Sequence, residues 1–133
     1  MRVFLDTNVL ASSIATRGLC SEVLESTLHD HELLTSDAVL SELERVLLTK
    51  LRLPSALVAE FLALLREEAQ LVNDRQMPSI SIPDADDVPI IASALGGKAD
   101  VFVTGDKALL DLREVDGLRM VSPRELWMQL AGL

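Results

Sequence analysis

The chain has 133 residues, of which 49% are hydrophobic, and its formal net charge is −9. This size and composition predict a single domain spanning 1–133 with a substantial core. No apolar stretch of about 18 residues is free of charges, and no cleavable apolar leader opens the chain, which argues against a membrane protein. The single cysteine, Cys20, cannot form an internal disulfide, so we expect a cytoplasmic protein.

The net negative charge bears on the class of partner. Phosphate contacts normally dominate affinity for nucleic acid, so an excess of acids disfavours a nucleic-acid-binding protein unless the basic residues gather on one rim. An acidic surface also suits a basic protein partner. The candidate phosphate contacts are Arg17, Lys50, Arg52, Lys98 and Lys107, each of which is more readily explained as an ordinary solvated charge.

Strand-like apolar runs alternate with helical patterns, which predicts βαβ units and a mostly parallel sheet. In chain order, we expect a strand at Arg2–Leu5, a helical stretch with Val9, Leu10 and Ile14, a helix from about Ser21, a short strand at Leu33–Leu34, a helix capped by Ser36 or Asp37, and a long helix from Pro54–Ser55. The last two helices are expected to pair as a hairpin.

The second half of the chain continues the same alternation. The expected elements are a strand at Leu71–Val72, a loop at Asn73–Pro83, a helix opened by Asp84–Asp87 and ended by Gly96–Gly97, a strand at Val101–Thr104, a short helix at Asp106–Leu112, a strand at Leu118–Val121 and a closing helix at Pro123–Leu130. Pro89 fits the first turn of its helix, where a missing N–H is harmless.

Four acids stand where a parallel sheet would bring them together. Asp6 and Asp106 follow apolar strands, whereas Glu42 and Asp87 lie in the first turns of predicted helices. In open α/β sheets the functional crevice lies outside the carboxyl ends of the strands. Carboxylates that converge there repel one another, and a hard divalent cation such as Mg²⁺ or Mn²⁺ relieves the repulsion. The pattern therefore favours metal-dependent phosphodiester hydrolysis.

Each acid also has a structural explanation. Asp6 can cap the next helix, and Asp106 can cap a short one after Thr104 and Gly105. Acids at a helix start favour the macrodipole, which accounts for one or two of those in Asp84–Asp87. Glu42 can be a solvated helix residue. Glu44 is its control, because it lies about 200° further round the helix and should face water.

The order of these blocks carries a resemblance. The blocks are Leu5-Asp6-Thr7-Asn8-Val9-Leu10, Ser41-Glu42-Leu43-Glu44-Arg45-Val46-Leu47, Asp84 to Asp87 before Ile90-Ile91-Ala92, and Val103-Thr104-Gly105-Asp106. Together they resemble the PIN-domain family, and within it the small VapC-like toxin-type ribonucleases. The resemblance covers almost the whole chain.

The resemblance implies a three-layer α/β/α sandwich around a mostly parallel sheet. It also implies Mg²⁺- or Mn²⁺-dependent cleavage of single-stranded RNA, control by an antitoxin protein, and a homodimer. The implied metal-site acids are Asp6, Glu42, Asp87 and Asp106, with Asn8 and Thr104 in support. Where relatives often carry a polar residue after the helix-opening acids, this chain has Val88-Pro89, which leaves open whether Asp86 or Asp87 is the site acid.

Two other functions are compatible with parts of the pattern. A PIN-like domain can serve as a catalytically silent protein-interaction module, although the presence of all four acids argues against lost catalysis. A haloacid-dehalogenase-like phosphatase also opens with an acid at a strand end, but it normally needs a second Asp where this chain has Asn8. A receiver-like signalling domain would place its acids in a different order.

Overall fold

The computed structural model describes residues 1–132 and contains one six-stranded sheet in the order β3-β2-β1-β4-β6-β5. The strands are β1 (Arg2–Leu5), β2 (Glu32–Thr35), β3 (Gln70–Leu71), β4 (Val101–Val103), β5 (Glu114–Val115) and β6 (Leu118–Val121). All neighbours pair in parallel except β5 and β6, which are antiparallel. The expected mostly parallel α/β sheet is confirmed. The final residue of the predicted domain, Leu133, lies outside the described residues.

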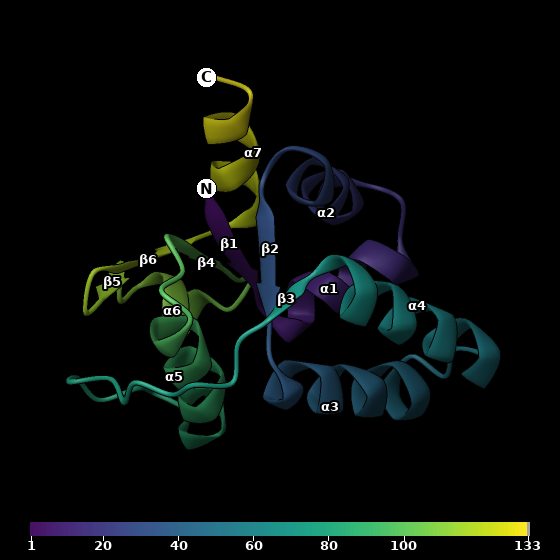
Figure 1. Cartoon of the computed structure of the whole chain (residues 1–133), viewed down its shortest axis with the longest axis horizontal. Helices are drawn as coiled ribbons and strands as arrows, with labels where there is room; N and C mark the ends of the chain where they lie inside the picture. Colours follow the sequence, from purple (N-terminus) through teal and green to yellow (C-terminus); the bar gives the residue numbers. More distant parts are fainter. Residues whose placement is uncertain (133) are drawn as a thin grey trace.

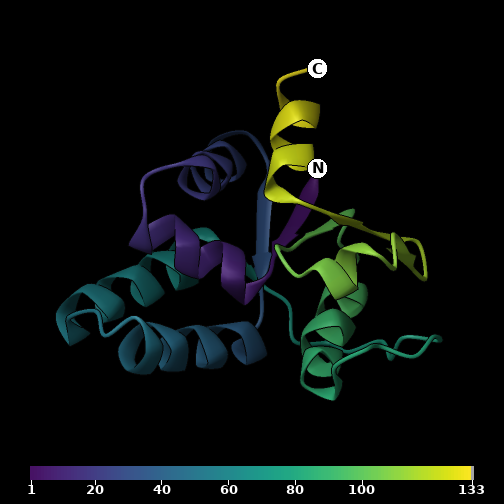
Figure 2. The ribbon, with the colours of Figure 1, turned by 180° about the vertical axis from the view of Figure 1, so that it is seen from behind.

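Helices flank this sheet on both faces (Figures 1 and 2). They are α1 (Thr7–Ala15), α2 (Leu19–Asp30), α3 (Asp37–Arg45), α4 (Ser55–Glu68), α5 (Val88–Gly96), α6 (Lys107–Leu110) and α7 (Pro123–Leu130), with a π-helical turn η1 (Val46–Lys50) and a 3₁₀ turn η2 (Ala85–Asp87). From β1 the chain steps to β2 in one direction and from β3 to β4 in the other, so right-handed crossovers place α1 and α2 on the face opposite α5. No helix within residues 1–132 is long and apolar enough to traverse a bilayer.

The core lies around the two central strands. Val3, Phe4 and Leu5 of β1 are fully buried, as a strand covered on both faces requires. Phe4 stacks on Phe102 of β4 with 5.5 Å between the ring centroids. Their packing anchors the pair of strands whose carboxyl ends carry Asp6 and Asp106.

The helices α3 and α4 form the hairpin that the sequence predicts (Figure 1). The turn η1 prolongs α3, and Arg52 then takes a left-handed conformation with φ of 52° before α4 begins. Leu43 and Leu47 from the first arm and Leu65 from the second are fully buried. The hairpin thus holds Glu42 on a packed helix beside the sheet.

One strand was not anticipated from the sequence. β5 pairs with β6 through a turn at Asp116 and Gly117, whose φ angles of 50° and 88° are both positive. Asp-Gly is a strong signal for such a hairpin turn, so the sequence did contain the information. Smaller differences are confined to element ends: α2 begins at Leu19, and α6 is limited to Lys107–Leu110.

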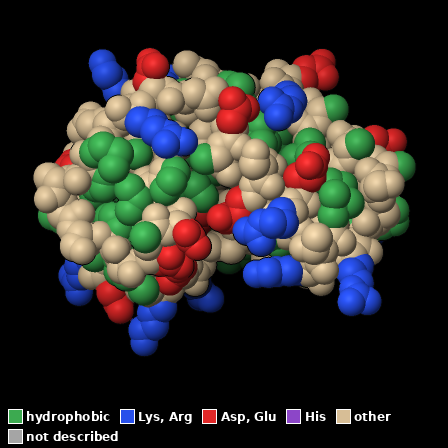
Figure 3. All heavy atoms as spheres, turned by 90° about the horizontal axis from the view of Figure 1, so that it is seen from below, with side chains coloured by type: hydrophobic (Ala, Val, Ile, Leu, Met, Phe, Trp, Pro, Cys, Tyr) green, Lys and Arg blue, Asp and Glu red, His purple; other side chains and the backbone are tan. Residues whose placement is uncertain are grey.

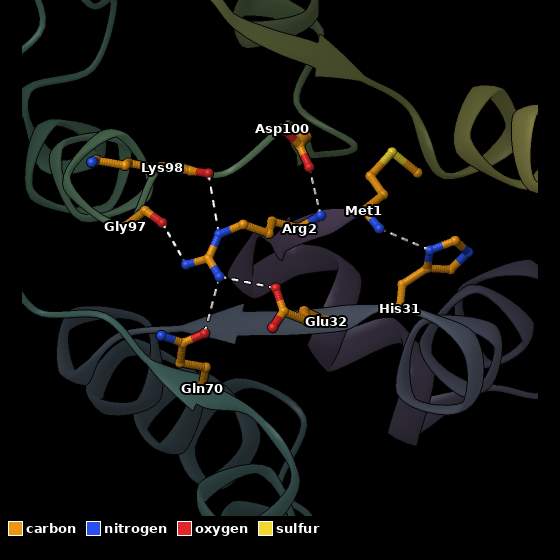
Figure 4. Close-up of polar contacts among 8 residues, drawn as sticks. All are labelled: Met1, Arg2, His31, Glu32, Gln70, Gly97, Lys98 and Asp100. Atoms are coloured by element: carbon orange, nitrogen blue, oxygen red, sulfur yellow. Dashed lines mark hydrogen bonds and ion pairs between the residues drawn. The ribbon is translucent and has the colours of Figure 1, made fainter.

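The amino-terminal end of the sheet is held by Arg2 (Figure 4). Its Nη1 donates to Glu32 at 2.9 Å and to Gln70 at 3.2 Å, which ties β1 to the starts of β2 and β3. Its other nitrogens donate to the backbone carbonyls of Gly97 and Lys98 at 2.7 and 3.3 Å. Arg2 therefore fastens the carboxyl end of α5 to the same three strands.

The loop between β3 and α5 passes close to the end of that helix. A Cβ atom at Gly96 would lie 1.8 Å from the carbonyl oxygen of Asp74, a backbone atom that cannot swing aside. We predict that Gly96→Ala lowers the free energy of unfolding by about 2 kcal/mol, the usual cost of overpacking. Gly18→Ala is the matched control, because nothing lies within 4 Å of its added Cβ. Equal denaturant midpoints for the two variants would contradict this packing.

Candidate metal centre

The four predicted acids lie around the carboxyl edge of the sheet. Asp6 directly follows β1, Asp106 follows β4 and caps α6, Glu42 is in α3, and Asp87 ends η2 at the start of α5. Figure 3 looks onto this edge and shows acidic side chains gathered near its middle, between two areas of apolar side chains. Four separate elements thus contribute to one crevice.

Asp6 is the most enclosed of these acids, with 4% of its surface exposed. Its Oδ1 accepts the backbone N–H of Thr7 at 2.8 Å, which caps α1. Its Oδ2 accepts the Thr104 hydroxyl at 2.8 Å and the Asn8 amide at 3.1 Å. A buried carboxylate with this many donors is held in one orientation, so the capping role and the site role of Asp6 coexist.

Asn8 and Thr104 also join the ends of β1 and β4. Asn8 Oδ1 accepts the backbone N–H of Gly105 at 2.9 Å, and Thr104 Oγ1 accepts the N–H of Asp106 at 3.0 Å. Thr104 is fully buried. The two predicted supporting residues therefore orient Asp6 and set the start of the turn that carries Asp106.

The electrostatics link all four acids. Burial raises the pKa of Asp6 above its usual range, while hydrogen bonds from Thr104 and Thr7 act to lower it. The pKa of Asp87 is raised to about 6, and burial is the largest cause. The charges of Asp6, Asp84, Asp106 and Glu42, in that order, supply the rest of this shift. The carboxylates are thus close enough to oppose one another's ionisation.

No basic side chain neutralises this cluster among the described residues, where the ion pairs are Arg2 with Glu32 and Arg66 with Asp37. Across residues 1–132, no three acidic, histidine or cysteine side chains are close enough to hold one metal ion together. The acids therefore ring the crevice at longer range. Mg²⁺ retains several waters and usually takes only one or two carboxylates directly, so an all-oxygen set of this kind fits it.

Solvent exposure distinguishes the acids that face the site from the acids next to them in the sequence. Glu42 is half-buried and Glu44 is exposed, as the predicted helix register requires. Asp87 is half-buried, whereas Asp86 is exposed and donates its backbone N–H to Asp84 Oδ1 at 2.9 Å. This favours Asp87 over Asp86 as the acid that faces the crevice. Asp84, which raises the pKa of Asp87, was not among the predicted site residues.

A buried hydroxyl pair beside the site was also missed. The hydroxyls of Ser36 and Ser93 lie 2.9 Å apart, and both side chains are almost fully buried. Ser36 caps the helix that carries Glu42, and Ser93 lies in the helix that follows Asp87. The contact sets the spacing of these two helices, and no local sequence pattern signals it.

Comparisons with known proteins give a family and a fold. A family model described as "PIN domain" matches residues 2–108. A chain of VapBC2 from Rickettsia felis, bound to a DNA fragment from its promoter, is 16% identical with a TM-score of 0.67, over 92% of this chain and 98% of that chain. VapBC-1 from nontypeable Haemophilus influenzae is 18% identical with a TM-score of 0.59, over 93% of this chain and 99% of that chain. PAE2754 from Pyrobaculum aerophilum is 17% identical with a TM-score of 0.61, over 100% of this chain and 97% of that chain. No curated protein sequence matches.

The raised pKa of Asp87 predicts a pH-dependent stability. The folded protein holds this proton up to about pH 6, whereas the unfolded chain releases it near 3.8. This contribution to the free energy of unfolding is full below the unfolded pKa and is lost as the pH rises through the folded pKa. In EDTA, Asp87→Asn should therefore be more stable relative to the natural protein at about pH 7.5 than at about pH 4. Thermal unfolding at both pH values measures this difference, and a constant difference would refute the raised pKa of Asp87.

Proposed function

The chain belongs to the PIN-domain family, and we propose that it is a Mg²⁺- or Mn²⁺-dependent endoribonuclease that cleaves single-stranded RNA as the toxin of a toxin–antitoxin pair. The observation that carries the proposal is the arrangement of the acids: the Asp6 carboxylate is buried at the end of β1 and held by Asn8 and Thr104, and Asp87 lies within the field of Asp6 and its acidic neighbours. A protein that keeps such a cluster without basic partners sacrifices stability, which a bound cation would restore.

The proposed ligands are the carboxylates of Asp6, Glu42, Asp87 and Asp106, some of them acting through water. A cation held there supplies Lewis acidity, since it acidifies water and neutralises charge on a phosphate. Asn8 and Thr104 are assigned the supporting role, because their hydrogen bonds to Oδ2 hold the Asp6 carboxylate in position. Products with 5′-phosphate and 3′-hydroxyl ends are expected from hydrolysis by water.

The chain's own charge determines how substrate approaches. The acids around the crevice repel an RNA phosphate, so productive binding requires that the cation is already present. Asp87, which has a pKa of about 6, is the acid most easily protonated within the physiological range, and we expect cation affinity to fall as it is protonated. Activity should therefore decline below about pH 6.

The proposed partners follow from the same surface. Two of the similar folds come from VapBC structures, which supports a small antitoxin as the regulator of this chain. A net charge of −9 suits a basic segment of such a partner. We also propose a homodimer that acts in the cytoplasm, where its RNA substrate would be met.

One observation favours a different function. Because no three ligating side chains of residues 1–132 are close enough to share a metal ion, a catalytically silent interaction module remains the competing hypothesis. The phosphatase alternative is weaker: Asn8 donates its amide to Asp6, which an aspartate in its place could not do. Metal binding and RNA cleavage separate the two leading hypotheses.

The direct test is cleavage of a mixed single-stranded RNA pool with Mg²⁺, with Mn²⁺ and with EDTA. We predict cleavage that requires metal and that falls in Asp6→Asn by at least about 100-fold, the upper range of losses for groups that only support a metal ligand. The fold of this variant should persist, because the remaining amide oxygen can still accept the Thr7 N–H and the change removes one member of a repelling cluster.

The matched control is Glu44→Gln, which removes one acid from the exposed side of the helix that carries Glu42. It should retain near-natural activity, whereas Glu42→Gln should lose most of it. Equal losses in both would overturn the assignment of Glu42, and full activity in Asp6→Asn would exclude Asp6 from the site.

A binding test needs no substrate. Mg²⁺ or Mn²⁺ should raise the thermal midpoint of the natural protein, because a ligand of the folded state stabilises by RT ln(1 + [L]/Kd). The increase should be smaller at about pH 5 than at about pH 7.5, since protonated Asp87 is a poor ligand. No shift with either metal, together with no cleavage, would favour the interaction module.

A further inference from the structure

A cavity lies between α6, β6 and the start of α7. Its volume is about 580 Å³, within the range of small-molecule sites. Two arginines, Arg113 and Arg119, line it together with two acids, Asp111 and Glu125. The mechanism proposed above assigns no role to any of these four side chains.

Two short paths link the cavity to the acids. One runs along α6, and the other passes through a hydrogen bond between β6 and the end of β4. Leu110, which lines it, is one helical turn from Asp106 and donates its N–H to the Asp106 carbonyl at 3.0 Å. That turn corresponds to about 6 Å along the helix axis. On the strand side, Val121 accepts the backbone N–H of Thr104, whose hydroxyl holds Asp6. The cavity therefore adjoins the chain segments that carry Asp106 and hold Asp6.

The cavity carries charged side chains of both signs that are free to contact a ligand. Within the described part of the chain, neither Arg113 nor Arg119 has a carboxylate within ion-pair distance. Glu125 accepts the N–H of Ser122 through Oε1 at 3.2 Å, and Asp111 is exposed. Two positive and two negative side chains give no net charge. Such a lining disfavours a bare phosphate, which the acids repel, and favours a neutral ligand with both donors and acceptors.

Recognition in this chain also has to rely on polar edges. Phe4, Phe61 and Phe102 are buried in the core. Trp127 is half-buried and lines a different cavity, beside His31 and Leu130. With no aromatic side chain at the arginine-lined cavity, base stacking on aromatic rings cannot carry recognition there.

We propose that this cavity binds an unpaired guanine of the RNA substrate, next to the scissile phosphate. Guanine accepts at O6 and N7, which a guanidinium contacts with two hydrogen bonds. It donates from N1 and its 2-amino group, which carboxylates accept. Single-stranded RNA is commonly read through such edges of bases that are turned out of the strand. The inference rests on the proposed ribonuclease function and adds a sequence preference to it.

The other bases match this lining less completely. Cytosine and adenine offer one amino donor each, and uracil offers one imino donor. Only guanine combines two adjacent acceptors with two adjacent donor groups on neighbouring edges. The two arginines and two acids therefore have a full set of partners with guanine alone.

The experiment uses labelled oligonucleotides of adenosine and uridine with one guanosine moved along the strand. Cleavage by the natural protein should occur at a constant offset from guanosine, with kcat/KM about 10- to 100-fold above the adenosine-substituted strand, the range of one bidentate contact. Arg119→Gln should bring this ratio close to one. Arg113→Gly should do the same while the protein stays folded, because φ of 62° at this position suits glycine.

Arg124→Gln is the matched control, since Arg124 is exposed on α7 and does not line the cavity. It should keep the guanosine ratio. A ratio that is unchanged in both Arg119→Gln and Arg113→Gly, or a constant preference for another base, would overturn the proposal.

A binding arm separates failure of this proposal from failure of the nuclease proposal. With Mg²⁺ and phosphorothioate strands that resist cleavage, fluorescence anisotropy should show tighter binding of the guanosine strand than of the adenosine strand, and the difference should vanish in Arg119→Gln. Guanosine monophosphate is then added as a competitor. Displacement of the guanosine strand shows that a single nucleotide is sufficient for binding, whereas no displacement shows that the strand is needed. If no RNA is cleaved but this difference is found, the ribonuclease proposal fails and the guanine site stands. Equal binding of both strands overturns the guanine site.

Discussion

The carboxylate of Asp6 is the constraint on which the crevice depends. It lies buried at the end of the central strand, where an ionised group is costly unless it is hydrogen-bonded. Donors from Thr7, Asn8 and Thr104 meet that requirement. Because Thr104 follows the neighbouring strand, satisfying one buried charge also brings two chain segments into register. The same hydrogen bonds therefore stabilise this edge of the sheet and fix the geometry of the site.

Under the proposed function, the same arrangement would let an acidic chain act on an acidic polymer. The repulsive charges are concentrated at one edge, where Asp87 already shows their cost in its raised pKa. A divalent cation bound there would change the local electrostatic potential from negative to positive at the place where a phosphate must sit. The rest of the acidic surface would continue to repel nucleic acid. Such a surface would discourage unspecific binding, and affinity would be restricted to the crevice and its immediate surroundings.

The sequence predicts the fold well where pattern and packing agree. The bounds Arg2–Leu5 and Pro123–Leu130 match the structure, since strong apolar runs and a proline at a helix start act locally. Glu114–Val115 was missed because a two-residue strand has no periodicity to detect, and only the Asp-Gly turn beside it signals the hairpin. The four predicted acids do share one electrostatic field. Asp84 was recognised as a helix-opening acid but not assigned to the site, because its effect on Asp87 arises from a 3₁₀ turn, which the local sequence does not specify.

Arg2, at the amino-terminal end of the sheet, is connected to the site acids at the opposite end through α5. It binds the carbonyl of Gly97 just beyond α5, and Asp87 stands at the other end of this nine-residue helix, about 14 Å away. The buried helix α5 therefore links the hydrogen bonds of Arg2 at the amino-terminal end of the sheet to Asp87 at the carboxyl edge.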